Sequence, residues 1–295
     1  MKFAPLPANC ARAVFISILV LFAHLSCGRD EGPSVSGTRI AVSIYPVGDI
    51  ARTIAGGRMR IFCAVPRGAN PHTFEPLPSV AKSLQNSRLF IGLHPEFDGW
   101  VEKYLKEGTK ISYLLNRGYR GNPHIWLSIE GGRGIARHIA GRLSTLDPDG
   151  ARIYRENLSS FEKQLTELDA RIRNMFRGLP DRKLIQWHPS WDLFASEYGL
   201  EIVDTIEKGH GREPTLGEFN RLVQAARERK VGVIVIDLKV QSKAATALAR
   251  ESGAALLRLD AIGDRDDPAA NSYIPLMENN ARLLARALSE GRSAR

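Results

Sequence analysis

Cysteine is scarce in this chain: only three occur among its 295 residues, at positions 10, 27 and 63. Two of them lie in the N-terminal segment, so Cys63 is alone in the rest of the chain. If that segment is cleaved and Cys27 is modified, no internal disulfide can form, and Cys63 should behave as a small buried apolar residue. The protein must then be stabilised by its cores, and a 43% hydrophobic content over this length suffices for two domains.

A long basic run is also missing, although the chain carries a formal charge of +9. Its arginine and lysine residues are spread among acidic residues along the expected helices, and no basic cluster is interleaved with aromatic residues. Nucleic-acid binding usually needs such a concentrated basic surface. We therefore interpret the excess as solvated surface charge and expect no nucleic-acid partner.

The apolar run Ala13–Leu25 is too short to span a membrane with ordinary flanks. Lys2 and Arg12 precede it, and small and polar residues follow it. A charged start, a short apolar centre and small residues are typical of a secretory signal peptide. We predict that residues 1–26 form one, which makes the mature protein extracytoplasmic.

Cys27 stands directly after this segment, where the lipidated cysteine of bacterial lipoproteins stands. His24 and Leu25 depart from the usual residues of that cleavage motif, so a plain signal peptide cleaved elsewhere is the alternative. The following polar stretch has no apolar periodicity. We expect residues 27–37 to be a tether and Cys27 to carry a lipid anchor.

Glycine and proline are both missing between residues 151 and 177, where apolar residues recur at helical spacing. This predicts one long helix over 147–179, with Asp147 as its N-cap. On either side, short apolar runs alternate with amphipathic stretches, which indicates parallel β-α-β units. We therefore predict an α/β fold with lobes 38–146 and 180–295 joined by this helix as an internal strut. A coiled-coil dimer arm is the alternative.

Three histidines stand beside prolines, in Asn70-Pro71-His72, Asn122-Pro123-His124 and His188-Pro189. Each lies in or just before an expected loop. A neighbouring proline limits the conformations of such a loop, so less entropy is lost when the loop binds a ligand. Three imidazoles presented in this way suit a borderline transition metal, above all zinc. The alternative is that they are three unrelated turn histidines.

Motifs around these histidines and further along the chain follow one another in a definite order: Gly68–Ser79 (GANPHTFEPLPS), Asn122–Leu127 (NPHIWL), His188–Leu200 (HPSWDLFASEYGL), Glu213–Val223 (EPTLGEFNRLV), Arg258–Asp264 (RLDAIGD) and Tyr273–Leu288 (YIPLMENNARLLARAL). In this order they resemble the zinc/manganese substrate-binding lipoproteins of ABC importers. The resemblance covers about Arg39 to Leu288. It implies two α/β lobes, each a mostly parallel sheet flanked by helices, joined by one long rigid helix with a metal in the cleft between them.

By position, the resemblance implies four metal ligands: His72 and His124 from the first lobe, and His188 and Asp260 from the second. It further implies a receptor, not an enzyme, that captures a divalent metal in the periplasm and delivers it to an ABC permease; we expect a monomer, anchored through Cys27. The residues agree, because His188 and Asp260 each end an expected strand and can face one cleft. Three imidazoles and one carboxylate complete a tetrahedral shell and leave no position for a catalytic water.

Several alternatives stay open at this point. A secreted zinc hydrolase would need an open metal position and a general base, for which Glu75 is the candidate. A clamp of similar layout could bind a metal chelate such as haem or a siderophore. His94 and His210 are reserve ligands, and Asp237 could line the cleft or cap a turn. Glu75 could instead accept a hydrogen bond from a ligand ring.

Which divalent metal the site binds is a finer question. His188 stands where manganese-type members of the family usually carry glutamate, which favours Zn²⁺. Members with three histidines and one aspartate hold either metal, so Mn²⁺ stays open. Many zinc members also carry a long loop rich in histidine and acidic residues before the second histidine. The short connection Leu115–Asn122 leaves no room for one here.

Overall fold

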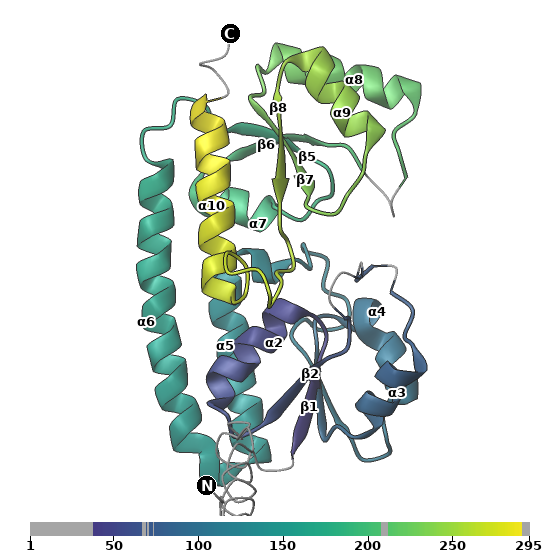
Figure 1. Ribbon diagram of the computed structural model, residues 1–295, viewed down its shortest axis with the longest axis vertical. Helices are drawn as coiled ribbons and strands as arrows, with labels where there is room; N and C mark the ends of the chain where they lie inside the picture. Colours follow the sequence, from purple (N-terminus) through teal and green to yellow (C-terminus); the bar gives the residue numbers. More distant parts are fainter. Residues whose placement is uncertain (1–37, 67–68, 70, 73, 208–211, 291–295) are drawn as a thin grey trace, which may run out of the picture. The chain divides into compact units, whose positions relative to one another are not determined.

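Two parallel four-stranded sheets organise the chain, one in each half (Figure 1). The computed structural model describes residues 38–66, 69, 71–72, 74–207 and 212–290. The predicted signal peptide, Cys27 and the tether lie outside the described residues. No helix in these described ranges is long and apolar enough to cross a membrane.

The first sheet, which defines the N-lobe, has the strand order β2-β1-β3-β4. Its strands are all parallel and all four residues long: β1 (Arg39–Val42), β2 (Arg60–Cys63), β3 (Leu89–Gly92) and β4 (Lys110–Tyr113). The central strand β3 is buried throughout, as expected of a parallel strand covered on both faces. Cys63 is a free thiol, as predicted, but it is half-buried where a buried residue was expected.

The second sheet, which defines the C-lobe, has the equivalent order β6-β5-β7-β8. Its parallel strands are β5 (Lys183–Gln186), β6 (Glu201–Thr205), β7 (Val233–Asp237) and β8 (Ala255–Leu259). The two halves therefore repeat one topology. In both, the carboxyl ends of the strands lie along one edge, from which the histidine-bearing loops leave.

Helices cover both faces of each sheet (Figure 1). The α-helices of the N-lobe are α2 (Tyr45–Ala55), α3 (Pro78–Gln85), α4 (Pro95–Asp98) and α5 (Ile129–Leu146), with 3-10 turns η1 (Gly99–Tyr104) and η2 (Ile125–Leu127). Those of the C-lobe are α7 (Asp192–Tyr198), α8 (Leu216–Glu228), α9 (Lys243–Ser252) and the closing helix α10 (Tyr273–Glu290). The architecture confirms the predicted α/β class with two parallel sheets.

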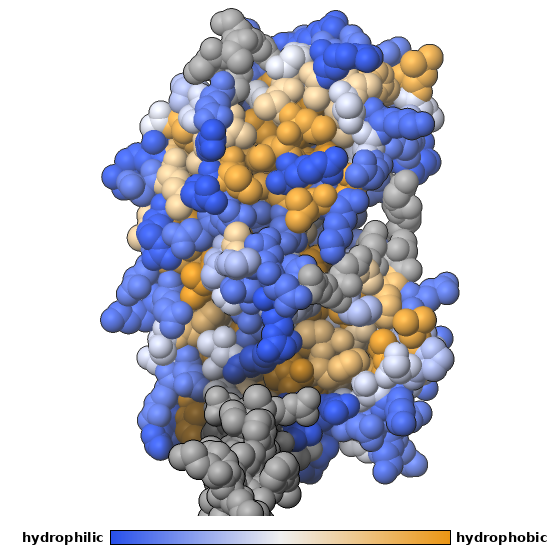
Figure 2. Space-filling view, in the orientation of Figure 1, coloured by the Kyte–Doolittle hydropathy of each residue, from blue (hydrophilic) through white to orange (hydrophobic). Residues whose placement is uncertain are grey.

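The linking helix is shorter than the predicted 147–179. A 3-10 turn, η3 (Pro148–Gly150), precedes the α-helix α6 (Ala151–Phe176), which has 26 residues and is therefore about 39 Å long. Asp147 does not cap it: its carboxylate accepts hydrogen bonds from Arg58 Nε at 2.9 Å and from Tyr154 Oη at 2.5 Å. Most of the apolar positions that recur at helical spacing are buried, whereas Leu158 and Met175 are half-buried. The outward side of α6 is polar and charged (Figure 2).

One hydrophobic core runs through both lobes. Alternate residues of the central strands face it from the N-lobe, as Ile91 does, and from the C-lobe, as Val235 does. Between them lie the buried sides of α5, α6 and α10, to which Phe161 and Leu284 belong. The opposite faces of the two sheets pack into separate, smaller cores. Each lobe thus buries one face against helices that it shares with the other lobe.

Hydrogen bonds between buried groups add to this shared core. Tyr273, at the start of α10, donates its hydroxyl to Ser128 O at 2.8 Å and its backbone N–H to Asp49 at 2.8 Å. Glu197 on α7 accepts from the backbone N–H groups of Ile129 and Glu130, which open α5. Burial raises the pKa of Glu197, but these two bonds satisfy its carboxylate. The lobes are joined by specific polar contacts as well as by apolar packing.

The Tyr273 hydroxyl gives a test of this junction. We expect Tyr273→Phe to lower the free energy of unfolding by about 1 kcal/mol, because a buried hydrogen bond is lost while Ser128 O keeps its bond from Gly132 N–H. Tyr113→Phe is the matched control, since its hydroxyl bonds Glu102 at an exposed position. Denaturant titration measures both. Equal losses in the two variants would contradict a special role for the buried bond.

Candidate metal centre

His72 lies in the turn that follows strand β2 and is the most exposed of the three proline-flanked histidines. The loop leaves the carboxyl edge of the N-lobe sheet, as predicted from the sequence. The imidazole rests edge-on against the Phe97 ring, with 5.1 Å between ring centroids. The same ring lies 4.8 Å, between centroids, from the ring of His188 in the C-lobe.

His124 is buried and its orientation is fixed by Asn122, two residues earlier. The amide oxygen of Asn122 accepts from the backbone N–H of His124 at 2.9 Å and lies 2.7 Å from ring Nδ1. Because Oδ1 can only accept, Nδ1 carries the ring proton and Nε2 presents its lone pair. Burial, together with the neighbouring His188 and His72, lowers the pKa of His124 to about 3, so the ring is neutral at physiological pH.

The side chain of Asn122 also forms hydrogen bonds with the C-lobe. Its amide nitrogen donates to Pro189 O at 2.6 Å and to Asp192 Oδ2 at 2.8 Å. One side chain therefore orients an N-lobe histidine and bonds the segment directly after His188. The asparagine of the Asn-Pro-His motif is a structural part of the site.

His188 follows strand β5, and its ring is held by Glu207, which follows strand β6. Ring Nδ1 lies 2.7 Å from Glu207 Oε2, and the side chain of Glu207 is only 3% exposed. A carboxylate beside Nδ1 fixes the proton there, so the other nitrogen carries the lone pair. That nitrogen, Nε2, is buried and has no hydrogen-bond partner among the described residues. A buried, oriented lone pair without a partner is what a metal ligand requires.

The three rings converge. One ring nitrogen from each of His72, His124 and His188 lies within 4.8 Å of the other two, and among the described residues no other group of three or more His, Cys, Asp or Glu side chains is placed to hold a metal in this way. The Nε2 atoms of His124 and His72 are 3.4 Å apart. Two nitrogens bound to one tetrahedral zinc at about 2.0–2.1 Å would be about 3.3 Å apart. The donor set and its spacing fit a small divalent ion.

Asp260 follows strand β8, as predicted, but is outside this group of three. Its Oδ1 accepts from the backbone N–H groups of Ile262 and Gly263, so this oxygen closes a turn. No described residue donates to Oδ2. A metal at the three imidazoles would therefore have to recruit Oδ2, and the assignment of Asp260 as fourth ligand stays a prediction.

Asp237 ends strand β7 beside these groups. Its pKa is raised to about 6, chiefly by burial; His188 lowers this pKa, and Asp260 and Glu207 raise it. The side chain of Asp237 makes no hydrogen bond with a described residue, which argues against the interpretation that it caps a turn. That it lines the site stays a prediction.

The other candidates are placed elsewhere or not described. His94 caps helix α4, accepting from Glu96 N–H at 3.1 Å through Nδ1, and is not in the group of three. Glu75 is exposed, and no described residue bonds its carboxylate. His210 lies outside the described residues. Sequence reasoning missed Asn122 and Glu207 as orienting residues; the repeated asparagine before Pro-His was the available signal for the first.

Comparison with known proteins decides the family. The family model described as "Zinc-uptake complex component A periplasmic" (ZnuA) matches residues 40–287. The chain belongs to this family. The resemblance seen in the sequence is thereby confirmed, and with it the expectation of a metal-binding substrate-binding protein of the ABC type in place of an enzyme.

Individual relatives agree with this. The metal ABC transporter substrate-binding lipoprotein FimA of Streptococcus parasanguinis is 26% identical, with 95% of this chain and 99% of that protein aligned. A crystal structure of ZnuA matches with a TM-score of 0.76 and 29% identity, over 86% of this chain and all of that one. The substrate-binding protein FpvC of Pseudomonas aeruginosa, solved in complex with Mn²⁺, matches with a TM-score of 0.76 and 25% identity, over 86% and 99%.

The Glu207–His188 contact gives a test of how the site is oriented. We expect Glu207→Ala to weaken metal binding by roughly 10- to 100-fold, because the ring loses the partner that fixes its tautomer and direction. Glu207→Gln keeps an acceptor for Nδ1–H and should lose less. Glu75→Ala removes an exposed carboxylate near His72 and serves as control. Isothermal titration with Zn²⁺ measures all three, and an unchanged affinity in Glu207→Ala would refute the orienting role.

Proposed function

We propose that this protein captures one Zn²⁺ ion outside the inner membrane and delivers it to an ABC permease. The proposed ligands are His72, His124, His188 and Asp260. The observation that carries the proposal is the convergence of three imidazole nitrogens from two lobes. Two of the rings are held through Nδ1 so that Nε2 points inward. The ion is the cargo of the protein, and the site only has to bind and release it.

Ligand chemistry supports zinc over manganese. Zn²⁺ accepts four nitrogen and oxygen ligands without a geometric preference, whereas Mn²⁺ has the lowest affinity in the divalent series and prefers oxygen ligands. The comparisons are divided on the metal: the family model is named for zinc uptake, whereas PsaA of Streptococcus mitis and MntA of Halalkalibacterium halodurans are named as manganese proteins and FpvC was solved with Mn²⁺. In this chain the third proposed ligand is the imidazole of His188. The carboxylate beside it, that of Glu207, already bonds this imidazole.

The same proposal includes location. A relative aligned over almost its whole length is named a lipoprotein, and the family model is named periplasmic. Together with the signal-peptide pattern of residues 1–26, this supports an extracytoplasmic protein held at the membrane through Cys27. We propose that it acts there as a monomer, with the permease as its partner.

The two rival functions fit the site less well. A hydrolase needs a general base at the metal, and Glu75 makes no contact with the histidines among the described residues. A metal chelate such as haem or a siderophore brings a coordination shell that is already largely filled. Three imidazoles with nitrogens within 4.8 Å of one another suit a bare ion, which needs every ligand the protein can supply.

Alanine substitutions test the ligand set. We expect His72→Ala, His124→Ala and His188→Ala each to weaken Zn²⁺ binding about a hundredfold or more, because each removes one of four bonds from a site worth roughly 10–16 kcal/mol. His138→Ala is the matched control: its ring bonds Ser112 at 2.7 Å, away from the group of three. Titration should give one ion per chain for wild type. Near-wild-type affinity in any of the three would remove that residue from the shell.

Metal choice is tested by the third histidine. We expect the wild-type protein to bind Zn²⁺ more tightly than Mn²⁺, and His188→Glu to narrow this difference, because a second carboxylate suits Mn²⁺ better. Competition titration of both metals against both proteins measures the ratio. Preference for Mn²⁺ in wild type would overturn the zinc assignment, and a wider zinc advantage in His188→Glu would overturn the role given to His188.

A further inference from the structure

The amino-terminal edge of the N-lobe sheet carries a row of cations. Arg60 pairs with Arg39 in the register of β2 and β1, and the backbone N–H of Arg88 donates to Arg39 O. The next strand, β4, begins with Lys110, whose N–H donates to Arg88 O. Three of the four strands thus begin at a basic residue, and Arg88 directly precedes the fourth, β3. Neighbouring strands are about 4.8 Å apart. The side chains of Arg60, Arg39 and Arg88 therefore leave the sheet at adjacent positions of the same register.

These cations have no acidic partner within the described ranges. Arg60, Arg88 and Lys110 are exposed and Arg39 is half-buried, yet none forms an ion pair or a side-chain hydrogen bond with a described residue. Many other arginines of the chain are paired, as Arg137 is with Glu162. Like charges on neighbouring strands repel one another, so the row destabilises the isolated protein slightly. An anionic surface placed against it would remove that cost.

The equivalent edge of the C-lobe has a different character. Its strands begin at Lys183, Glu201, Val233 and Ala255. The lysine lies beside the glutamate in register, and Arg229 also bonds Glu201. The two lobes share one topology, so the basic row is a property of the N-lobe sequence and does not follow from the fold.

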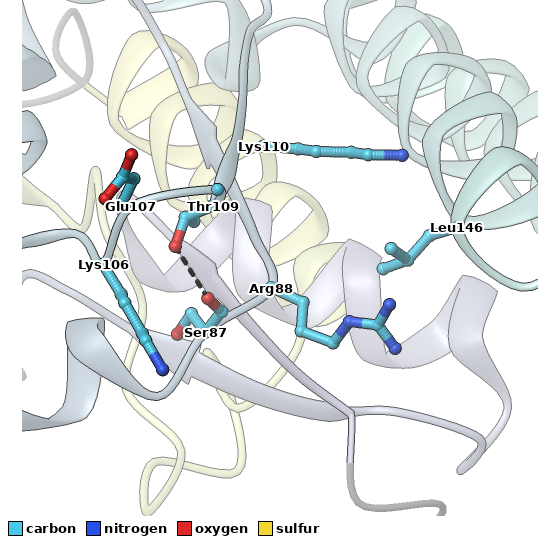
Figure 3. A pocket seen from close by; sticks show the side chains of 8 residues that line it. Ser87, Arg88, Lys106, Glu107, Thr109, Lys110 and Leu146 are labelled. Atoms are coloured by element: carbon cyan, nitrogen blue, oxygen red, sulfur yellow. Dashed lines mark hydrogen bonds between the residues drawn. The ribbon is translucent and has the colours of Figure 1, made fainter.

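A pocket of about 210 Å³ opens at the β3 and β4 end of the row (Figure 3). Arg88, Lys106 and Lys110 line it, and Glu107 is its only acidic lining residue. Thr109 Oγ1 donates to Ser87 O at 3.1 Å and so joins the segments that precede β3 and β4. In the view of Figure 3, Arg88 and Lys110 extend to the same side, toward Leu146. The pocket offers cationic groups from both a strand start and a turn, an arrangement that suits a phosphate-bearing headgroup.

The position of the row relative to the chain indicates which anionic surface it meets. Strand β1 starts at Arg39, so the predicted tether 27–37 joins the fold at this edge. Its eleven residues span at most roughly 38 Å when extended. We propose that the basic row Arg60–Arg39–Arg88–Lys110, with Lys106, docks on anionic phospholipid headgroups of the membrane to which the chain is anchored. This rests on the proposed anchoring at Cys27, which would keep the row within reach of the bilayer.

Docking at this edge leaves the metal site accessible. The histidines follow the carboxyl ends of strands β2 and β4, whereas the cations stand at the amino ends of the same sheet. Headgroup phosphates therefore meet the row and not the imidazoles. Vesicle binding and metal binding should therefore be independent of each other. A failure of this inference can then be told apart from a failure of the proposed function.

The test uses a soluble chain that begins at Gly28 and so keeps every described residue. We expect it to co-sediment with vesicles of phosphatidylcholine containing 40% phosphatidylglycerol in low salt, and not with vesicles of phosphatidylcholine alone. The double substitution Arg88→Glu/Lys110→Glu should weaken binding by roughly thirtyfold. Arg221→Glu/Lys243→Glu makes the same charge change at exposed positions of α8 and α9 and should have less than a threefold effect.

Three outcomes would overturn the proposal: no binding to the anionic vesicles, equal losses in the two double variants, or loss of wild-type binding in a few millimolar inorganic phosphate at constant ionic strength. The last would show a site for the free anion in place of a membrane surface. Zn²⁺ titration of the same three proteins should give equal affinities. Unequal affinities would contradict the independence of the two edges, whereas absent zinc binding in all three would count against the proposed function alone.

Discussion

The fixed distance between the two lobes is the constraint on which the candidate site depends. Each sheet buries one face against the shared helices α5, α6 and α10, so the lobes cannot separate without exposing a common core. Tyr273 and Glu197 add buried hydrogen bonds across the same junction. Proteins whose lobes are linked by flexible strands can close around a ligand by hinge bending. Here the histidines from both lobes already lie within 4.8 Å, which leaves loop movement as the route for an ion to enter and leave.

Within that frame, the electrostatics of the site favour a cation. Asn122 and Glu207 hold the Nδ1 protons of His124 and His188, so both rings turn a lone pair inward. Burial keeps His124 neutral, and lone pairs brought this close repel one another unless a positive ion lies between them. On the C-lobe side, the Glu207 carboxylate bonds Nδ1 of His188. It supplies negative charge close to an ion held by the imidazoles, in a place with little water.

The sequence was a good guide to whatever depends on local pattern. Apolar periodicity predicted the parallel units, the buried face of α6 and the loop positions of His72, His124 and His188. Sequence-based prediction failed where a contact joins residues that are far apart in the chain. Asp147 looked like a helix cap, but Arg58, 89 positions earlier, and Tyr154 take its carboxylate. The sequence could not reveal Glu207 as an orienting residue, because its partner, His188, lies 19 positions away in the loop after another strand.

Parallel topology also explains how one small sheet can carry two unlike surfaces. All strands of the N-lobe run the same way, so their carboxyl ends collect at one edge and their amino ends at the other. The first edge carries loops whose proline-fixed histidines must stay neutral to bind a metal. The second begins with Arg60, Arg39 and Lys110, which must stay charged to attract anions. Each strand separates the two edges by its own length, and the Debye length of about 8 Å at physiological salt screens one from the other across water. The substrate site and a basic docking edge can therefore change independently in sequence while they share one core.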